Sequence, residues 1–451
     1  MQPLTRPWLP ITRALMCALV LSVSAAGRAS ATPYTWNLPR GFPTPNVPPG
    51  NPMTVEKVEL GRFLFYDTRL SGNQTQACAS CHQQALAFTD GLPRGIGSTG
   101  QMHPRGPMSL TNVAYNASFA WANPLLLTVE KQVLLPMFGE TPVELGLTGK
   151  EDELPDRFQS DTRYRRLFAE AYPDDDTPFT QDVIVGHIVQ GLTSFVRTLI
   201  SGNAPYDRYV NGLDDNALSA SALHGQRLFT SETLECFHCH GGFNFSDSVT
   251  FQGKGFDEIN FHNNALYNID GMGGYPPDNT GIFAFTQIPE DMGSFKAPTL
   301  RNIELTAPYM HDGTIATLDG VMAHYAAGGR SITDGPYAGD GSKNPFKSGF
   351  IRGFQISDSD TQDVLNFLKS LTDEEFIHNP RLSDPFNADA YAGDCDLDGT
   401  VTTQDLLTSV QLALDQTTLA TCVVGDSDGD GAVRVDELVK AVNRAASTPT
   451  P

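Results

Sequence analysis

Apolar residues recur at helical spacing in several stretches of the chain. In Thr180–Ile200 they fall on one face of a helix, at Val183, Ile184, Ile188, Leu192 and Phe195. Similar patterns over Glu130–Leu135 and Ser359–Leu371 predict two more helices. Long Gly-, Pro- and Asn-rich loops separate these stretches, and convincing alternating strand patterns are few. The pattern therefore predicts a mainly α-helical protein.

The first residues have the order of an export signal. Arg6 and Arg13 precede an apolar run over residues 14–26, and Ala29-Ser30-Ala31 offers the small residues of a cleavage site. This order is typical of a secretory signal peptide, here residues 1–31. The run is shorter than the ~20 residues that a membrane span needs, and we expect no span elsewhere. We therefore expect the mature protein in the periplasm or secreted from the cell.

Composition limits the number of domains and the kinds of partner. A length of 451 residues suggests about three domains. With 52 acidic and 30 basic residues the formal net charge is −22, which would repel a phosphate backbone, so we expect no nucleic-acid partner. A polar segment over residues 379–393 is expected to be a linker that leads to an acidic tail.

A short unit occurs twice in the chain. Gly61-Arg62-Phe63-Leu64-Phe65 leads to Cys78-Ala79-Ser80-Cys81-His82, and Gly225-Gln226-Arg227-Leu228-Phe229 leads to Cys236-Phe237-His238-Cys239-His240. Two related halves are the simplest explanation, and we place them at residues 32–210 and 211–378. Cys-x-x-Cys-His is the attachment sequence for c-type haem, in which two thiols hold the porphyrin and the histidine binds iron. We therefore expect two covalent c-type haems, with His82 and His240 as proximal ligands. No motif surrounds His224 or His262, which we expect to be ordinary histidines.

Further motifs around these units resemble the bacterial di-haem cytochrome c peroxidases and their relative MauG. The resemblance runs from about Pro52 to Leu371 and includes Ser109-Leu110-Thr111-Asn112, Glu144-Leu145-Gly146, Lys296-Ala297-Pro298-Thr299-Leu300-Arg301-Asn302 and Thr306-Ala307-Pro308-Tyr309-Met310-His311-Asp312-Gly313. Within the family, residues 85–93 and 121–124 look closest to MauG-like enzymes found with methanobactin systems. The resemblance implies two mostly helical cytochrome-c-like domains, with a peroxidatic haem in the first and an electron-transfer haem in the second.

The resemblance also implies active-site residues. Glu144 looks like the distal carboxylate, which moves a proton between the two peroxide oxygens when the O–O bond breaks. The spacing from Gln132 to Glu144 is two residues longer than the family pattern, so Glu140 is the alternative acid. Gln132 and Pro136 would line the same pocket. Trp121 resembles the tryptophan that lies between the two haems.

The sixth ligand of the second haem separates the candidate activities. Fourteen residues after His311, the family's cytochrome c peroxidases carry methionine and MauG-like enzymes carry tyrosine. That position is Tyr325 here, with Met322 and His324 as alternatives. Tyrosine implies that hydrogen peroxide forms a high-valent di-haem state, which oxidises an external donor such as a protein. The alternatives are a cytochrome c peroxidase that detoxifies hydrogen peroxide and a non-enzymatic di-haem electron carrier.

Calcium is expected in two places. Asn112, Thr306 and Pro308 match the family's calcium ligands between the domains. Two loops of the tail have the residue spacing of EF-hand calcium loops, with ligand positions at Asp394, Asp396, Asp398, Thr400 and Asp405 and at Asp426, Asp428, Asp430, Ala432 and Glu437. Each loop leads into a helical pattern, Leu406–Leu414 or Leu438–Ala446, so residues 394–447 resemble a dockerin-type module for which a cohesin-like protein is a candidate partner. Cys395 and Cys422 are free to form a disulfide in an exported protein.

Overall fold

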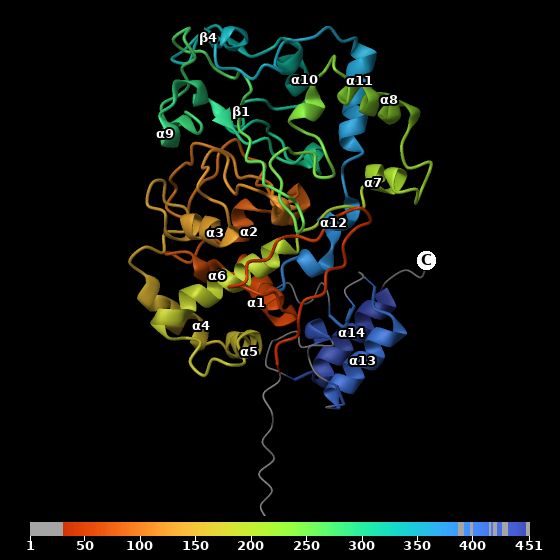
Figure 1. The fold of residues 1–451 in the computed structure, drawn as a ribbon. Helices are drawn as coiled ribbons and strands as arrows, with labels where there is room; N and C mark the ends of the chain where they lie inside the picture. Colours follow the sequence, from red (N-terminus) through yellow and green to blue (C-terminus); the bar gives the residue numbers. More distant parts are fainter. Residues whose placement is uncertain are drawn as a thin grey trace, which may run out of the picture.

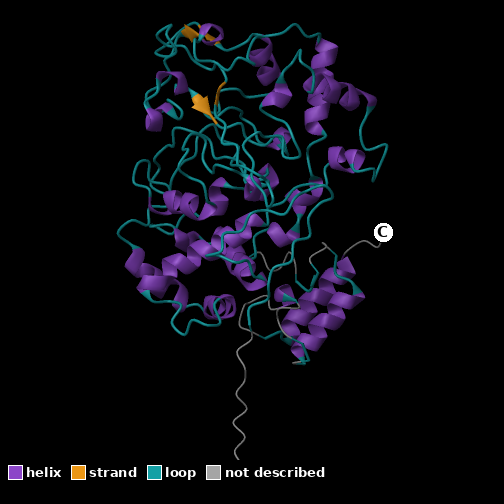
Figure 2. Cartoon of the chain, in the orientation of Figure 1, coloured by secondary structure: helices purple, strands orange, loops and turns teal. Residues whose placement is uncertain are grey.

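The computed structural model describes residues 30–386, 392–396, 400–414, 416–417, 422–425 and 432–447. Helices and long loops dominate it, as Figures 1 and 2 show, so the predicted mainly helical class is confirmed. The helices are α1 (Val55–Tyr66), α2 (Cys78–Cys81), α3 (Val129–Phe138), α4 (Leu154–Gln159), α5 (Thr162–Ala171), α6 (Gln181–Arg197), α7 (Pro205–Val210), α8 (Ala220–Phe229), α9 (Phe283–Thr286), α10 (Leu318–Ala326), α11 (Asp358–Lys369), α12 (Glu374–His378), α13 (Thr403–Ala413) and α14 (Val435–Ser447). Helices α3, α6 and α11 overlap the three stretches that the apolar pattern singled out, although α6 ends at Arg197 and α11 at Lys369, before the ends of the predicted stretches. Among the described residues, no helix combines the length and the apolar character that a membrane crossing requires.

In the described part of the chain, the strands form two short antiparallel pairs. In the first, β1 (His262–Asn263) pairs with β2 (Ser294–Phe295), and His262 lies opposite Phe295. In the second, β3 (Ser331–Ile332) pairs with β4 (Gly339–Asp340). Both pairs lie in the second half of the chain, where they fasten long loops rather than form a layer of their own (Figure 2).

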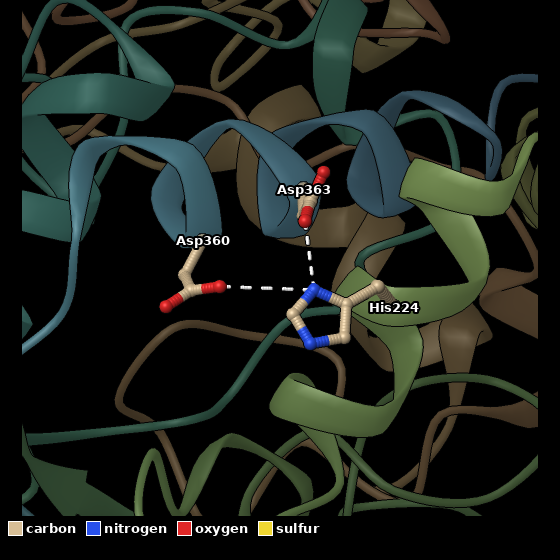
Figure 3. A group of neighbouring side chains, drawn as sticks. All are labelled: His224, Asp360 and Asp363. Carbon is tan, nitrogen blue, oxygen red and sulfur yellow. Dashed lines mark hydrogen bonds and ion pairs between the residues drawn. The ribbon is translucent and has the colours of Figure 1, made fainter.

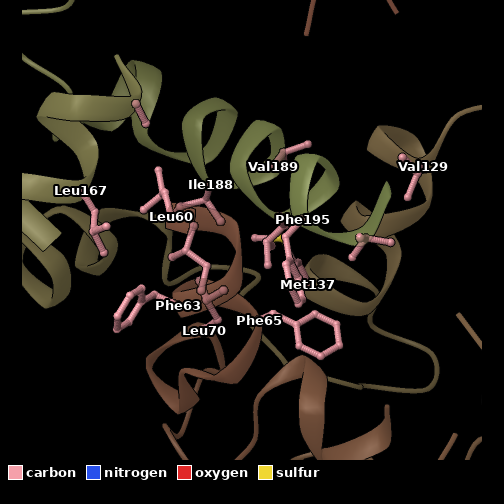
Figure 4. Close-up of a cluster of buried hydrophobic side chains, with 14 of the residues drawn as sticks. Leu60, Phe63, Phe65, Leu70, Val129, Met137, Leu167, Ile188, Val189 and Phe195 are labelled. Carbon is pink, nitrogen blue, oxygen red and sulfur yellow. The ribbon is translucent and has the colours of Figure 1, made fainter. Parts of the chain in front are cut away.

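The first half of the chain builds its hydrophobic core around α1 and α6 (Figure 4). Leu60 and Phe65 from α1 and Ile188 and Phe195 from α6 are almost completely buried there. The two helices cross at a glycine, because a Cβ atom on Gly61 would lie only 1.9 Å from the carbonyl oxygen of Gly191. This close approach explains the glycine at the start of the repeated unit.

In the second half, α8 and α11 also cross at a glycine. A Cβ atom on Gly225, the glycine of the second unit, would lie 1.9 Å from the carbonyl oxygen of Asp363. Phe229 from α8 and Phe367 from α11 are buried in the core beside this crossing. The repeat found in the sequence therefore corresponds to one helix crossing that occurs in both halves.

The two cores exchange short segments. Trp121 and Ala122, which precede α3, pack in the core of the second half. In return, Phe376 and Ile377 from α12 are buried in the core of the first half. The Gln84 amide donates a hydrogen bond to the Phe376 carbonyl over 3.1 Å. Each segment thus packs in the core of one half although its position in the sequence belongs to the other half.

A buried ion pair attaches the second half to α7. The two terminal nitrogens of Arg301 lie 2.8 and 2.9 Å from the two carboxylate oxygens of Asp207. Their side chains are only 1% and 4% exposed. The Arg301 guanidinium also donates to the Phe243 carbonyl over 2.9 Å from Nε. Such a pair is costly to break, because the remaining partner would be an uncompensated buried charge.

The tail folds as two helices beside the first half (Figure 1). Cys395 and Cys422 form a disulfide with an S–S distance of 2.10 Å, a pairing that the sequence allowed but did not establish. Leu412, Cys422 and Val433 form a small core under α13 and α14. The expected ligands Asp398, Asp426, Asp428 and Asp430 lie outside the described residues, as do residues 1–29 of the expected signal peptide.

Candidate active site

The first Cys-x-x-Cys-His loop presents its histidine in the form that binds iron. Nδ1 of His82 lies 2.8 Å from the Phe88 carbonyl oxygen. A carbonyl can only accept, so Nδ1 carries the proton and Nε2 keeps a lone pair. Burial lowers the pKa of His82, although the hydrogen bond to Phe88 opposes this shift. A neutral imidazole next to the thiols of Cys78 and Cys81 fits the attachment of a c-type haem.

The second loop repeats this arrangement. Nδ1 of His240 lies 3.1 Å from the Phe245 carbonyl oxygen, which again leaves Nε2 available for iron. Burial is the main reason why the pKa of His240 is lowered. Cys236 and Cys239 remain unpaired thiols, as do Cys78 and Cys81, whereas the two tail cysteines form a disulfide. The four thiols and two imidazoles therefore fit two haems.

Glu144 lies close to the first attachment loop. Burial is the main cause that raises the pKa of the Cys81 thiol, and the negative charges of Asp90 and Glu144 add to it. Oε1 of Glu144 lies 3.8 Å from Nε2 of His103. Burial raises the pKa of the Glu144 carboxyl. Glu140 is exposed, and of the two alternative acids Glu144 is the one whose charge contributes to the raised pKa values of the Cys78 and Cys81 thiols.

Helix α3 brings Gln132 and Pro136 to the same region. The Pro136 carbonyl accepts a hydrogen bond from the Leu145 N–H over 2.8 Å, which joins α3 to the segment of Glu144. Oε1 of Gln132 is buried and has no hydrogen-bond partner among the described residues. An unpartnered buried acceptor is costly unless a ligand or water satisfies it. The buried Oε1 of Gln132 is therefore suited to accept a hydrogen bond from a polar ligand or a water molecule.

Trp121 is held between segments of both halves. Its Nε1–H donates to the Gly106 carbonyl over 2.9 Å, and the Gly106 N–H donates to the His311 carbonyl over 3.1 Å. The Lys296 N–H donates to the Trp121 carbonyl over 2.8 Å. The indole is thus fixed where the first-half loop around Gly106 meets two motifs of the second half.

Helix α10 places Tyr325 beside the second attachment loop. Burial is the main cause that raises the pKa of Tyr325, and the charges of Cys239 and Cys236 add to it, whereas a hydrogen bond with Asn264 opposes it. Met322 is only 6% exposed and packs in the second core. Nε2 of His324 lies 2.8 Å from the carbonyl oxygen of Asn264. Of the two titratable candidates, Tyr325 is the one on which the charges of the haem-binding thiols act.

The three expected calcium ligands between the halves are Asn112, Thr306 and Pro308. The Asn112 side chain is fully buried, its amide donates to the Ser201 carbonyl over 2.9 Å, and its oxygen accepts from the Ser201 N–H over 2.8 Å. Asn112 therefore has partners within the protein. Thr306 and Pro308 are partly buried. Calcium binding by these three residues stays a prediction.

Three acids of the first tail loop converge. One carboxylate oxygen each from Asp394, Asp396 and Asp405 lies within 4.8 Å of the others. Asp405 also accepts hydrogen bonds from the Cys395 N–H over 2.9 Å and the Thr402 N–H over 2.8 Å. Thr400, another expected ligand of this loop, is described as well, and Ala432 and Glu437 are the expected ligands of the second loop that lie within the described residues. Calcium binding here also stays a prediction.

Sequence analysis missed two polar groups near the second loop. One is Asn264, the neighbour of Tyr325. The other is His262, whose Nε2 lies 2.6 Å from Oδ2 of Asp247. Burial would lower the pKa of His262, but hydrogen bonds to Asp247 and Cys239 outweigh it and raise that pKa to about 10. Asp247 follows the second Cys-x-x-Cys-His sequence closely in the chain, and this was the one available signal.

Comparisons with known proteins agree with these features. The model of the di-haem cytochrome c peroxidase family matches residues 55–215. Over 327 residues the chain is 31% identical to the methylamine utilization protein MauG of Methylorubrum extorquens, covering 72% of this chain and 81% of that protein. It is also 31% identical over 387 residues to a cytochrome-c peroxidase of Denitromonas iodatirespirans, covering 81% and 94%. A solved structure of a MauG-like protein associated with microbial copper homeostasis is similar with a TM-score of 0.76 and 45% identity, over 78% of this chain and 99% of that chain. The chain therefore belongs to the di-haem cytochrome c peroxidase and MauG family of oxidoreductases, whose name implies two c-type haems.

Proposed function

We propose that this protein is a MauG-type oxidase, which uses hydrogen peroxide to oxidise an external protein donor. The observation that carries the proposal is the position of Tyr325 beside Cys236 and Cys239, while Met322 is buried in the core. A phenolate is a hard anionic ligand that favours oxidised iron, whereas a thioether ligand raises the reduction potential. The second site would then suit storage of an oxidising equivalent better than acceptance of electrons from a small cytochrome.

The first site supplies the acid–base chemistry. His82 would hold the first iron through Nε2, and Glu144 would take the proton from the near oxygen of peroxide and return it to the far oxygen. When bound, the two haems supply the redox chemistry, since they accept two oxidising equivalents from peroxide and pass them to a donor. The buried Oε1 of Gln132 would accept a hydrogen bond from peroxide or water in the same pocket.

Trp121 would carry charge between the two sites. Its indole N–H donates to a backbone carbonyl, which does not take up a proton at ordinary pH. Oxidation of the indole by one electron would therefore leave its proton in place, and the charge could pass without proton transfer. The 45% identity to a MauG-like protein supports this assignment over a simple peroxidase.

The exchange of Tyr325 for methionine tests the proposal. In the diferric holoenzyme, hydrogen peroxide should react without prior reduction and give a near-infrared absorption band that decays slowly when no donor is present. Tyr325→Met should lose the band and oxidise a reduced cytochrome c faster than the wild-type protein does. Tyr337→Met is the matched control, because Tyr337 lies in the same half and is exposed.

The second candidate is a cytochrome c peroxidase that removes hydrogen peroxide. The 31% identity to a protein of that name favours it. It would be correct if the wild-type protein reacts with peroxide only after one haem is reduced and then consumes reduced cytochrome c efficiently. In that case Tyr325→Met would have little effect on the rate.

We also propose that the protein is exported and that its tail binds calcium. The Cys395–Cys422 disulfide supports export to the periplasm or the medium, because such bonds persist in oxidising compartments. The convergence of Asp394, Asp396 and Asp405 supports a cation in the first loop. The tail would then serve as a dockerin-type module that attaches the enzyme to a cohesin-like partner.

A further inference from the structure

A histidine and two aspartates meet where α8 crosses α11 in the second half of the chain (Figure 3). His224 comes from α8, and Asp360 and Asp363 come from α11 (Figure 3). Nδ1 of His224 lies 2.7 Å from Oδ2 of Asp363 and 3.7 Å from Oδ1 of Asp360. The crossing at Gly225 places these side chains side by side, because Gly225 lets the two helices approach closely next to His224 and Asp363.

Both carboxylates are oriented by serine hydroxyls. The Ser357 hydroxyl donates to Oδ2 of Asp360 over 2.8 Å, so that Oδ1 faces His224. The Ser221 hydroxyl donates to Oδ1 of Asp363, so that Oδ2 faces the same imidazole. Ser221 is itself held by the Asn366 amide over 2.8 Å. Two carboxylates that each turn one oxygen toward one ring nitrogen are more than a single ion pair requires.

An ion pair alone leaves the negative charge of the second carboxylate without a partner in this group. One N–H can donate to Asp363, but the 3.7 Å distance is too long for a hydrogen bond to Asp360. The two aspartates are three residues apart on one helix, where like charges repel each other. A divalent cation would neutralise both carboxylates and accept the nitrogen lone pair. Metal–ligand distances of about 2.0–2.2 Å need only small side-chain rotations, since the three ligand atoms already lie within 4.8 Å of one another.

We propose that His224, Asp360 and Asp363 form a binding site for a divalent transition-metal ion that links α8 to α11. One imidazole and two carboxylates suit copper(II), nickel(II) or zinc(II), whereas calcium and magnesium prefer oxygen ligands alone. Copper(II) should bind most tightly, as the usual order of affinities for such ligands requires. The side chains are 23–41% exposed, so water can complete the coordination sphere and the ion can enter from solvent.

This site would act on the second half of the protein. Helix α8 leads into the loop of Cys236 and Cys239, and α11 packs across it in the second core. An ion that binds the folded crossing and not the unfolded chain stabilises the fold. Metal binding should therefore raise the unfolding temperature of the holoenzyme.

Equilibrium dialysis of the chelator-treated holoenzyme tests the proposal, because covalently attached haem keeps its iron. Zinc(II) and copper(II) are the probes, and bound metal is measured by elemental analysis. The wild-type protein should bind one ion more than His224→Gln does. Binding of this ion should raise the unfolding temperature of the wild-type protein. Ser221→Ala removes only the hydroxyl that orients Asp363 and should weaken binding by about 10–100-fold. His378→Gln is the matched control, because His378 faces one carboxylate, Glu374, at 3.5 Å.

A second control separates this site from another three-membered group that contains a histidine, namely Glu232, Glu235 and His238. His238→Gln should leave binding of the ion unchanged. The proposal is overturned if His224→Gln binds as much metal as the wild-type protein, or if His238→Gln removes the ion instead. If His224→Gln does not fold, Asp360→Asn is the test variant, because it changes one partly exposed atom. The peroxide reaction should be the same in the variants of His224, Ser221, Asp360 and His378, none of which lies in an attachment loop, so a failure here is distinct from a failure of the proposed function.

Discussion

Replacement of Glu144 by glutamine removes the proposed acid–base group with little change in size. The carboxylate would transfer a proton between the two peroxide oxygens, and loss of such a group typically costs about 10²–10⁴ in rate. Nε2 of His103 lies 3.8 Å from Oε1 of Glu144. Burial lowers the pKa of His103, which favours the neutral ring, and its Nδ1 accepts a hydrogen bond from the Arg105 N–H over 3.2 Å. Nε2 therefore carries the proton and cannot replace the lost base, so we expect the full decrease of about 10²–10⁴, which is about 3–5 kcal/mol in barrier height.

The assay is the second-order rate of reaction of the diferric holoenzyme with hydrogen peroxide, measured by stopped-flow absorbance. Glu140→Gln is the matched control and should stay within about twofold of the wild-type rate, because its exposed carboxylate makes no proton transfer. Haem content and the visible spectrum should be unchanged in both variants. If Glu144→Gln keeps the wild-type rate and Glu140→Gln loses it, Glu140 is the acid and the assignment is wrong.

The pH profile gives an independent check on Glu144. Only the ionised carboxylate can take the first proton, so the rate should fall as the pH drops through the pKa of Glu144. Burial raises this pKa, and the acid limb should therefore lie above the ordinary glutamate range. In Glu144→Gln this limb should disappear. An identical acid limb in the wild type and the variant would assign the titration to another group.

The remaining predictions concern stability and the tail. Arg301→Met should destabilise the protein by about 3–5 kcal/mol in urea unfolding, because Asp207 would stay buried without its partner; a loss below 1 kcal/mol would contradict a buried pair. Phe376→Ala should cost about 3–5 kcal/mol and expose the first haem to chemical reduction more than the second, since Phe376 packs in the first core. Deletion of residues 394–451 should leave both haems and the peroxide reaction intact. Calcium should increase the helical circular dichroism of the full chain but not of the deletion variant, and equal responses would argue against the calcium loops.

Local chemistry made the haem loops readable from the sequence. Covalent attachment requires two thiols and a histidine within five residues, so both haem-binding pentapeptides can be recognised from the sequence alone. The repeated glycines were visible as well, but their reason was not, because the close approach of Gly61 to Gly191 and of Gly225 to Asp363 depends on helices far apart in the chain. The difference between Glu144 and Glu140 also depends on the path of the chain after α3, which spacing alone left open.

Longer-range groupings were beyond the sequence pattern. His224 has no motif around it, and its two carboxylate neighbours lie more than a hundred residues later, so the sequence alone predicts an ordinary histidine. Phe376 has an apolar side chain near the end of the second half, and nothing in its local pattern directs it to the first core. Such non-local contacts are set by how the halves pack, whereas periodicity reports only which face of an element is buried.

The exchange of segments between the cores has a consequence for biosynthesis. The contact between Gln84 and Phe376 joins residues that are 292 positions apart. A ribosome that adds about 5–20 residues per second needs about 15–60 s to pass from one to the other. The first attachment loop is therefore made early, yet its surroundings are completed only after the second loop has emerged. Ribosome stalling or proteolysis between the two positions would consequently leave the earlier-made loop, rather than the later one, without its finished packing.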